Sequence, residues 1–85
     1  MSDEQISLSR AEQALENGSA EEAIQILQRL LKEQADNTDA KALLGEALIE
    51  AGRLDEATKV LEDVVRQLPD DFDLQFDLGD VYFEL

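Results

Sequence analysis

Apolar residues recur every three to four positions along most of the chain, which is the spacing of amphipathic helices. The clearest example runs through Leu54, Ala57, Val60, Leu61, Val64, Val65 and Leu68. The spacing predicts an all-α protein of five helices, at about 4–17, 20–34, 38–51, 54–67 and 72–84. Because the connecting segments are short, consecutive helices should pack antiparallel.

Turn and capping residues separate the predicted helices. Ser19, followed three residues later by Glu22, fits a capping box at the start of the second helix. Residues 36–39, with the sequence Asp-Asn-Thr-Asp, combine turn and N-cap residues before the third helix. Pro69 disfavours helix at the residue before it, so a new segment should begin after it.

The sequence repeats with a period of 34 residues. A shift of this length aligns Glu12 with Glu46, Glu16 with Glu50, Gly18 with Gly52, Glu22 with Glu56, Ala23 with Ala57, Leu27 with Leu61 and Asp36 with Asp70. The matches fall where a helical hairpin needs special residues. Gly18 and Gly52 can take the left-handed conformation that ends a helix, and Ala23 and Ala57 let two helices approach closely. The period therefore indicates tandem helical hairpins.

This pattern resembles the tetratricopeptide repeat, whose 34 residues read W-x2-L-G-x2-Y, then Ala-x3-Phe, then Pro. The second repeat carries Lys41, Leu44, Gly45, Leu48, Ala57, Leu61 and Pro69 at these positions, and a half repeat carries Gln75, Leu78, Gly79 and Tyr82. The first repeat departs from the pattern at Arg10, where a leucine is expected. The resemblance implies a single domain, residues 1–85, stacked as a right-handed superhelix of two and a half repeats: 4–37, 38–71 and 72–85. A generic helical bundle is the alternative.

The resemblance also implies a concave groove, which the first helix of each repeat lines. The groove residues would be Leu8, Glu12, Leu15, Glu16, Ala42, Glu46, Ile49, Glu50, Phe76, Asp80 and Phe83, together with Gln5, Asp39, Asp73 and Glu84. Their apolar members lie off the stripe that packs neighbouring helices. They could therefore form an apolar strip for a partner, or they could pack against the next repeat.

Charge narrows the possible partners. The formal net charge is −14, from 21 acidic and 7 basic residues, so nucleic acids and anionic membranes are disfavoured as partners. Family members that hold the acidic tails of chaperones use Lys, Arg and Asn in the groove. The corresponding places here carry Glu12, Glu46 and Asp80, which would repel such a tail. The acidity could instead serve solubility or adaptation to high salt.

Catalytic and metal-binding chemistry has little support in the sequence. There is no cysteine or histidine, so thiolate chemistry and imidazole ligands are excluded. The acidic run after Pro69 fails as a calcium loop, because an EF-hand begun at Asp71 would place Phe76 at the required glycine and Tyr82 at the required glutamate. We expect neither an enzyme nor a bound metal or cofactor. No run approaches the roughly 18 apolar residues of a membrane span and no signal peptide is visible, so we expect a cytoplasmic protein.

Two functions follow as expectations. The first is a protein–protein interaction adaptor whose groove binds a basic or amphipathic segment of a protein or peptide partner. The second is a self-assembly element of a larger repeat protein without a peptide ligand, with a possible homodimer through residues 72–85. That segment has apolar side chains on nearly every side and no polar capping helix, so we expect either neighbouring repeats or a second copy to cover it.

Overall fold

A computed structural model describes residues 3–67 together with Gly79 and Phe83, and this part of the chain contains four α-helices and no strand. The helices are α1 (Asp3–Glu16), α2 (Ala20–Glu33), α3 (Thr38–Glu50) and α4 (Leu54–Gln67). Their ends agree with the predicted ranges to within one residue. The predicted fifth helix, 72–84, lies outside the described residues except for Gly79 and Phe83, which are both helical. The right-handed superhelix stays a prediction.

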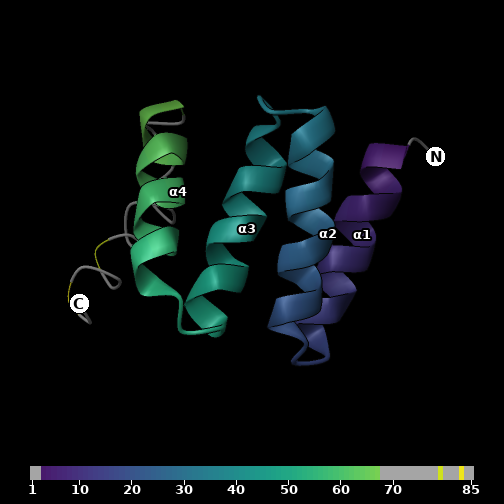
Figure 1. Ribbon diagram of the computed structural model, residues 1–85, viewed down its shortest axis with the longest axis horizontal. Helices are drawn as coiled ribbons and strands as arrows, with labels where there is room; N and C mark the ends of the chain where they lie inside the picture. Colours follow the sequence, from purple (N-terminus) through teal and green to yellow (C-terminus); the bar gives the residue numbers. More distant parts are fainter. Residues whose placement is uncertain (1–2, 68–78, 80–82, 84–85) are drawn as a thin grey trace.

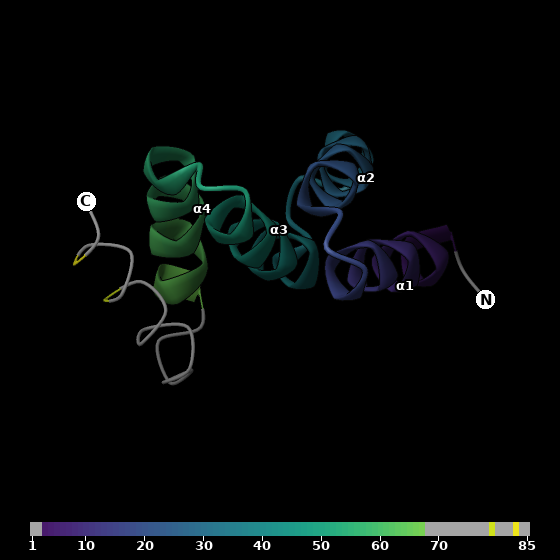
Figure 2. The same ribbon diagram turned by 90° about the horizontal axis from the view of Figure 1, so that it is seen from below.

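The four helices form two antiparallel hairpins that stack side by side in chain order (Figure 1). Each helix packs against the next one, and α1 also contacts α3. Seen from below, α2 stands on one side of α1 and α3, which lie next to each other (Figure 2). The first helices of the two hairpins therefore share one face of the molecule.

Two glycines end the first helix of each hairpin in the same way. Gly18 and Gly52 have φ angles of +79° and +77°, the left-handed conformation that a Cβ atom would strain. After each glycine, a backbone N–H reaches back across the helix end: Ser19 N–H donates to Ala14 O at 2.8 Å, and Arg53 N–H to Leu48 O at 2.8 Å. Both ends are Schellman motifs, so the local prediction from the glycines is confirmed.

The two N-terminal caps have different outcomes. The cap expected within residues 36–39 is Asn37, whose side-chain oxygen accepts a hydrogen bond from Ala40 N–H at 3.0 Å. The predicted capping box at Ser19 and Glu22 is wrong: Ser19 precedes α2, but its side chain makes no capping hydrogen bond. Ser19 also closes the preceding Schellman motif, and its backbone has φ −101° and ψ +63°. An N-cap residue ordinarily has β-region backbone angles, which let its hydroxyl reach the next amides.

Small residues at the helix crossings let the core form. Six alanines are buried at these crossings: Ala11, Ala14, Ala23, Ala40, Ala47 and Ala57. Larger fully buried side chains fill the space between them: Ile24, Leu27, Leu48, Leu61 and Val64. The equivalent alanines Ala23 and Ala57 are both completely buried, as the repeat predicts. Arg10, the departure from the pattern, is exposed, whereas its counterpart Leu44 is buried against the core.

Candidate partner-binding groove

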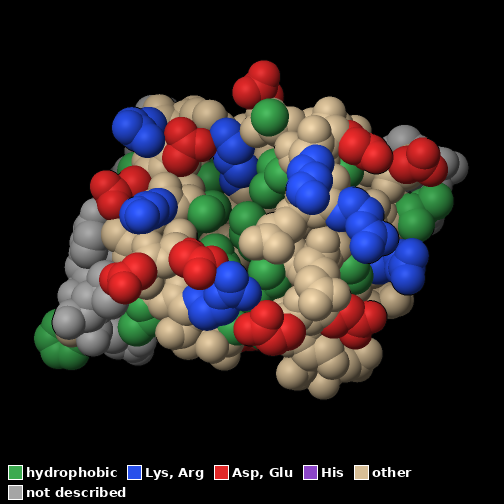
Figure 3. All heavy atoms as spheres, in the orientation of Figure 1, with side chains coloured by type: hydrophobic (Ala, Val, Ile, Leu, Met, Phe, Trp, Pro, Cys, Tyr) green, Lys and Arg blue, Asp and Glu red, His purple; other side chains and the backbone are tan. Residues whose placement is uncertain are grey.

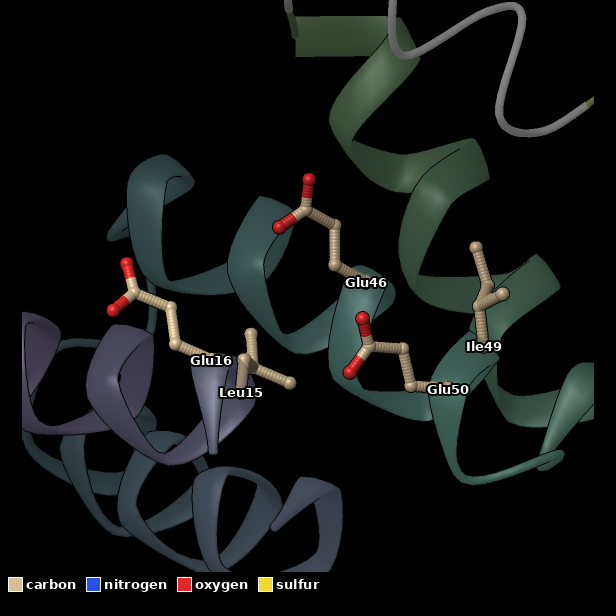
Figure 4. A pocket seen from close by; sticks show the side chains of 5 residues that line it. All are labelled: Leu15, Glu16, Glu46, Ile49 and Glu50. Atoms are coloured by element: carbon tan, nitrogen blue, oxygen red, sulfur yellow. The ribbon is translucent and has the colours of Figure 1, made fainter. Parts of the chain in front are cut away.

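Two adjoining hollows lie along the face that α1 and α3 share. One, of about 340 Å³, is lined by Leu15, Glu16, Glu46, Ile49 and Glu50 (Figure 4). The other, of about 300 Å³, is lined by Leu8, Glu12, Asp39, Ala42, Leu43 and Glu46. Since Glu46 borders both, we treat them as one surface and call it the groove, defined by these ten residues.

Aliphatic side chains form the floor of the groove. Leu8, Leu15 and Ile49 are half-buried and pack against the core, while part of each side chain stays open to the hollows. Leu8 and Leu15 are seven residues apart on α1, as are Ala42 and Ile49 on α3. Seven residues are two turns of helix, so each pair lies on one stripe. These side chains therefore pack against the core and also line the open surface.

Carboxylates form the walls, and none of the ten lining residues is basic. Glu12, Glu16, Asp39, Glu46 and Glu50 are exposed. In Figure 4 the Glu16, Glu46 and Glu50 side chains stand around the opening beside Leu15. Several negative charges around an aliphatic floor give the surface a negative electrostatic potential, which favours cationic ligands.

The basic side chains lie elsewhere. All 7 lysines and arginines of the chain are among residues 3–67, but only Arg10 and Lys41 belong to α1 and α3. Lys41 Nζ lies 2.8 Å from Asp63 Oδ2 of α4, and this hydrogen bond, with the charges of Lys41 and Arg66, lowers the pKa of Asp63 against partial desolvation. Figure 3 shows basic groups interspersed with acidic ones on the face that carries α2. The groove lining thus carries only negative charge, whereas that face carries charges of both signs.

The groove brings together nine residues that the sequence analysis proposed: Leu8, Glu12, Leu15, Glu16, Asp39, Ala42, Glu46, Ile49 and Glu50. Phe76 and Asp80 lie outside the described residues, and Phe83 is 92% exposed. Sequence reasoning missed Leu43. Its counterpart in the first repeat is Ser9, so the 34-residue register carries no signal for an apolar residue there.

The groove offers aliphatic surface and negative charge. Within the described part of the chain, no three acidic, histidine or cysteine side chains are grouped so that they could hold a metal ion. The helices in the same part of the chain are too short or too polar to cross a membrane.

Comparison with known proteins gives one finding. The family model described as tetratricopeptide repeat matches residues 14–78, which begin near the end of α1 and include all of α2, α3 and α4. The match begins after Arg10, the position at which the first repeat departs from the pattern. No curated protein and no solved structure matches the chain.

Proposed function

Because the chain belongs to the tetratricopeptide repeat family, a family of interaction modules rather than of enzymes, we propose that it is a protein–protein interaction adaptor. Its groove binds a segment of a partner protein that is amphipathic and basic. The observation that carries the proposal is the lining of the groove, an aliphatic floor bordered by five carboxylates and no base.

The two parts of the lining have separate roles in binding. Leu8, Leu15 and Ile49 supply apolar surface, and its burial under a partner contributes about 25 cal/mol per Å². The carboxylates attract basic side chains, and such complementarity raises the association rate and selects against acidic partners. An amphipathic helix with apolar residues on one face and Lys or Arg beside them satisfies both requirements.

A designed peptide pair tests this proposal. One peptide is a helix with leucines on one face and lysines beside them; the other has glutamate in place of each lysine. Fluorescence anisotropy should detect binding of the lysine peptide and not of the glutamate peptide, and binding should weaken as salt rises. Comparable binding of both peptides would contradict the proposal.

Matched variants place the peptide on the groove. The groove variant, Glu16→Lys/Glu50→Lys, reverses the charge of two exposed wall residues. The control variant, Glu22→Lys/Glu62→Lys, makes the same charge change at exposed positions on α2 and α4. We expect the groove variant to weaken binding at least about tenfold, equivalent to about 1.4 kcal/mol, and the control variant much less. Equal losses would show that net charge alone attracts the peptide.

A second candidate function is self-assembly through residues 72–85. The observation that favours it is Phe83, the most exposed large apolar side chain among the described residues, at 92%. Burial of such an aromatic side chain by a partner lowers the free energy of the complex. Light scattering on the wild type and on Phe83→Glu tests this candidate, which predicts that the wild type associates and that the variant does so less.

A further inference from the structure

A third hollow, of about 340 Å³, lies on the outer side of the α1–α2 hairpin and shares no lining residue with the groove. Its lining residues are Asp3, Ile6, Ser7, Arg10, Ile26, Arg29, Leu30, Glu33 and Gln34, and we call this surface the head. Ile6 is 41% exposed, and Phe83 is the other exposed large apolar residue in the described part of the chain.

The repeat register shows what the head lacks. Ile6 and Arg10 of α1 correspond to Ala40 and Leu44 of α3, and both of these are buried where α3 packs against α2. In the second hairpin a preceding helix thus covers this face. Within the described structure no helix covers the same face of the first hairpin.

The head also carries two arginines, Arg10 and Arg29, that form no ion pair with the described residues. Ser7 and Arg29 correspond to Lys41 and Asp63, which form the ion pair between α3 and α4. The first hairpin cannot form that pair, because a serine faces an arginine. Neither Arg10 nor Arg29 lies within 4.0 Å of a carboxylate of the described residues, although Asp3 and Glu33 line the same hollow. Two guanidinium groups that share a hollow with Ile6 and Ile26 suit a ligand that is both acidic and apolar.

The chain itself contains such a segment. Beyond Arg66 it has no basic residue, and residues 70–84 contain six acids: Asp70, Asp71, Asp73, Asp77, Asp80 and Glu84. All four aromatic residues of the chain lie in this segment: Phe72, Phe76, Tyr82 and Phe83. The segment follows α4 in the chain, and α4 and α1 lie at opposite ends of the row of helices (Figure 1). Because the head belongs to α1 and α2 and the segment follows α4, the docked segment would come from another molecule.

We propose that the head binds the acidic, aromatic segment 72–85 of a second copy of this chain. The inference rests on the second candidate function, which it makes specific, and does not depend on the groove. Arg10 and Arg29 pair with carboxylates of the segment, and Ile6 and Ile26 receive its aromatic side chains. The two surfaces differ, so the contact is head-to-tail, and it can continue beyond a dimer instead of closing on itself.

Two complementary variants test this arrangement in the full 85-residue chain. The head variant is Arg10→Glu/Arg29→Glu, and the tail variant is Phe83→Glu. In sedimentation velocity the mass of the wild type should rise above 9.5 kDa with concentration, over a range of about 10 to 500 µM, and the rise should shrink in high salt. Each variant alone should stay monomeric, because each lacks one of the two surfaces.

An equimolar mixture of the two variants gives the decisive result. The head variant retains an intact tail and the tail variant an intact head, so the mixture should form a dimer that does not grow further. A symmetric contact between two tails predicts the opposite, namely that the head variant associates as the wild type does. That result, or failure of the mixture to associate, would overturn the head-to-tail proposal and leave the second candidate function standing.

A charge-matched control tests whether added negative charge alone, at any position, prevents association between copies of the chain. Lys32→Glu/Lys59→Glu shifts the net charge by the same amount, at exposed lysines that do not line the head. We expect this variant to associate like the wild type, and circular dichroism should show that all variants keep their helices. An equal loss of association in the control, or a wild type that stays monomeric over the whole range, would also overturn the proposal.

Discussion

Gly45 of α3 lies directly against Leu61 of α4. A Cβ atom on Gly45 would stand 2.5 Å from Leu61 Cδ2 and 2.9 Å from Leu61 Cγ. Leu61 is completely buried and cannot swing into solvent. The equivalent pair in the first hairpin is Ala11 and Leu27, both completely buried, so α1 and α2 accommodate a methyl group where α3 and α4 do not. The two hairpins share a register but differ in the space available beside this position.

Gly45→Ala should therefore destabilise the protein. Alanine gains about 0.5–1 kcal/mol of helix propensity over glycine, but overpacking a core typically costs about 1–3 kcal/mol. Because the contact is with a buried side chain, we expect the cost to prevail, and urea unfolding should give a net loss of about 1–2 kcal/mol. In a Leu61→Ala background the same change should be neutral or stabilising. An equal loss in both backgrounds would show that the two side chains do not compete for space.

Asn37 joins three segments and should contribute more than its cap. Its oxygen caps α3, while its side-chain nitrogen donates to Glu4 Oε1 of α1 at 2.7 Å and to Gln34 Oε1 at 3.0 Å. Loss of an N-cap side chain costs about 0.5–2 kcal/mol, and we expect Asn37→Ala to fall in the upper half of that range. Glu4→Ala removes one acceptor and leaves the cap, so thermal melts should show a smaller loss. If Glu4→Ala costs as much as Asn37→Ala, the cap itself contributes little.

The ion pair between Lys41 and Asp63 should make part of the stability depend on pH. The pKa of Asp63 is lower in the folded protein than in the unfolded chain, first because Lys41 donates a hydrogen bond to the carboxylate. Such a group contributes stability above its unfolded pKa, near 3.9, and the contribution is lost as the pH falls through the lower folded pKa. Asp63→Asn should therefore lower the melting temperature at pH 7 and have little effect at about pH 2.

The melting temperatures of the variant and the wild type must be compared at the same pH. Protonation of the other carboxylates also changes the charge repulsion in a chain of net charge −14. Asp55→Asn, at an exposed position on the same helix with no ion pair in the described structure, serves as the matched control. A melting-temperature difference for Asp63→Asn that is equal at both pH values would refute the assigned role of the pair.

The local sequence was sufficient to predict those features that depend on interactions between residues close together in the chain. The 3.6-residue spacing located the four described helices, and Gly18 and Gly52 located two helix ends, because few other residues adopt a positive φ without strain. The cap of α3 was located only to residues 36–39, and the structure assigns it to Asn37. Ser19 shows the limit. Ser19 and Glu22 match the sequence pattern of a capping box, but the Schellman motif of the preceding helix already determines the backbone conformation of Ser19.

For the groove, the resemblance to the tetratricopeptide repeat assigned nine of the lining residues to one face, because residues that repeat at a 34-residue interval take equivalent places in successive hairpins. Their arrangement required the tertiary structure. That Glu46 borders both hollows and that Leu43 lines one depend on how α1 packs beside α3, and this packing depends on side-chain volumes at contacts distant in sequence. The exposure of Arg10 is likewise a tertiary property. It depends on whether another helix packs against this face of α1, and not on the residue type at position 10.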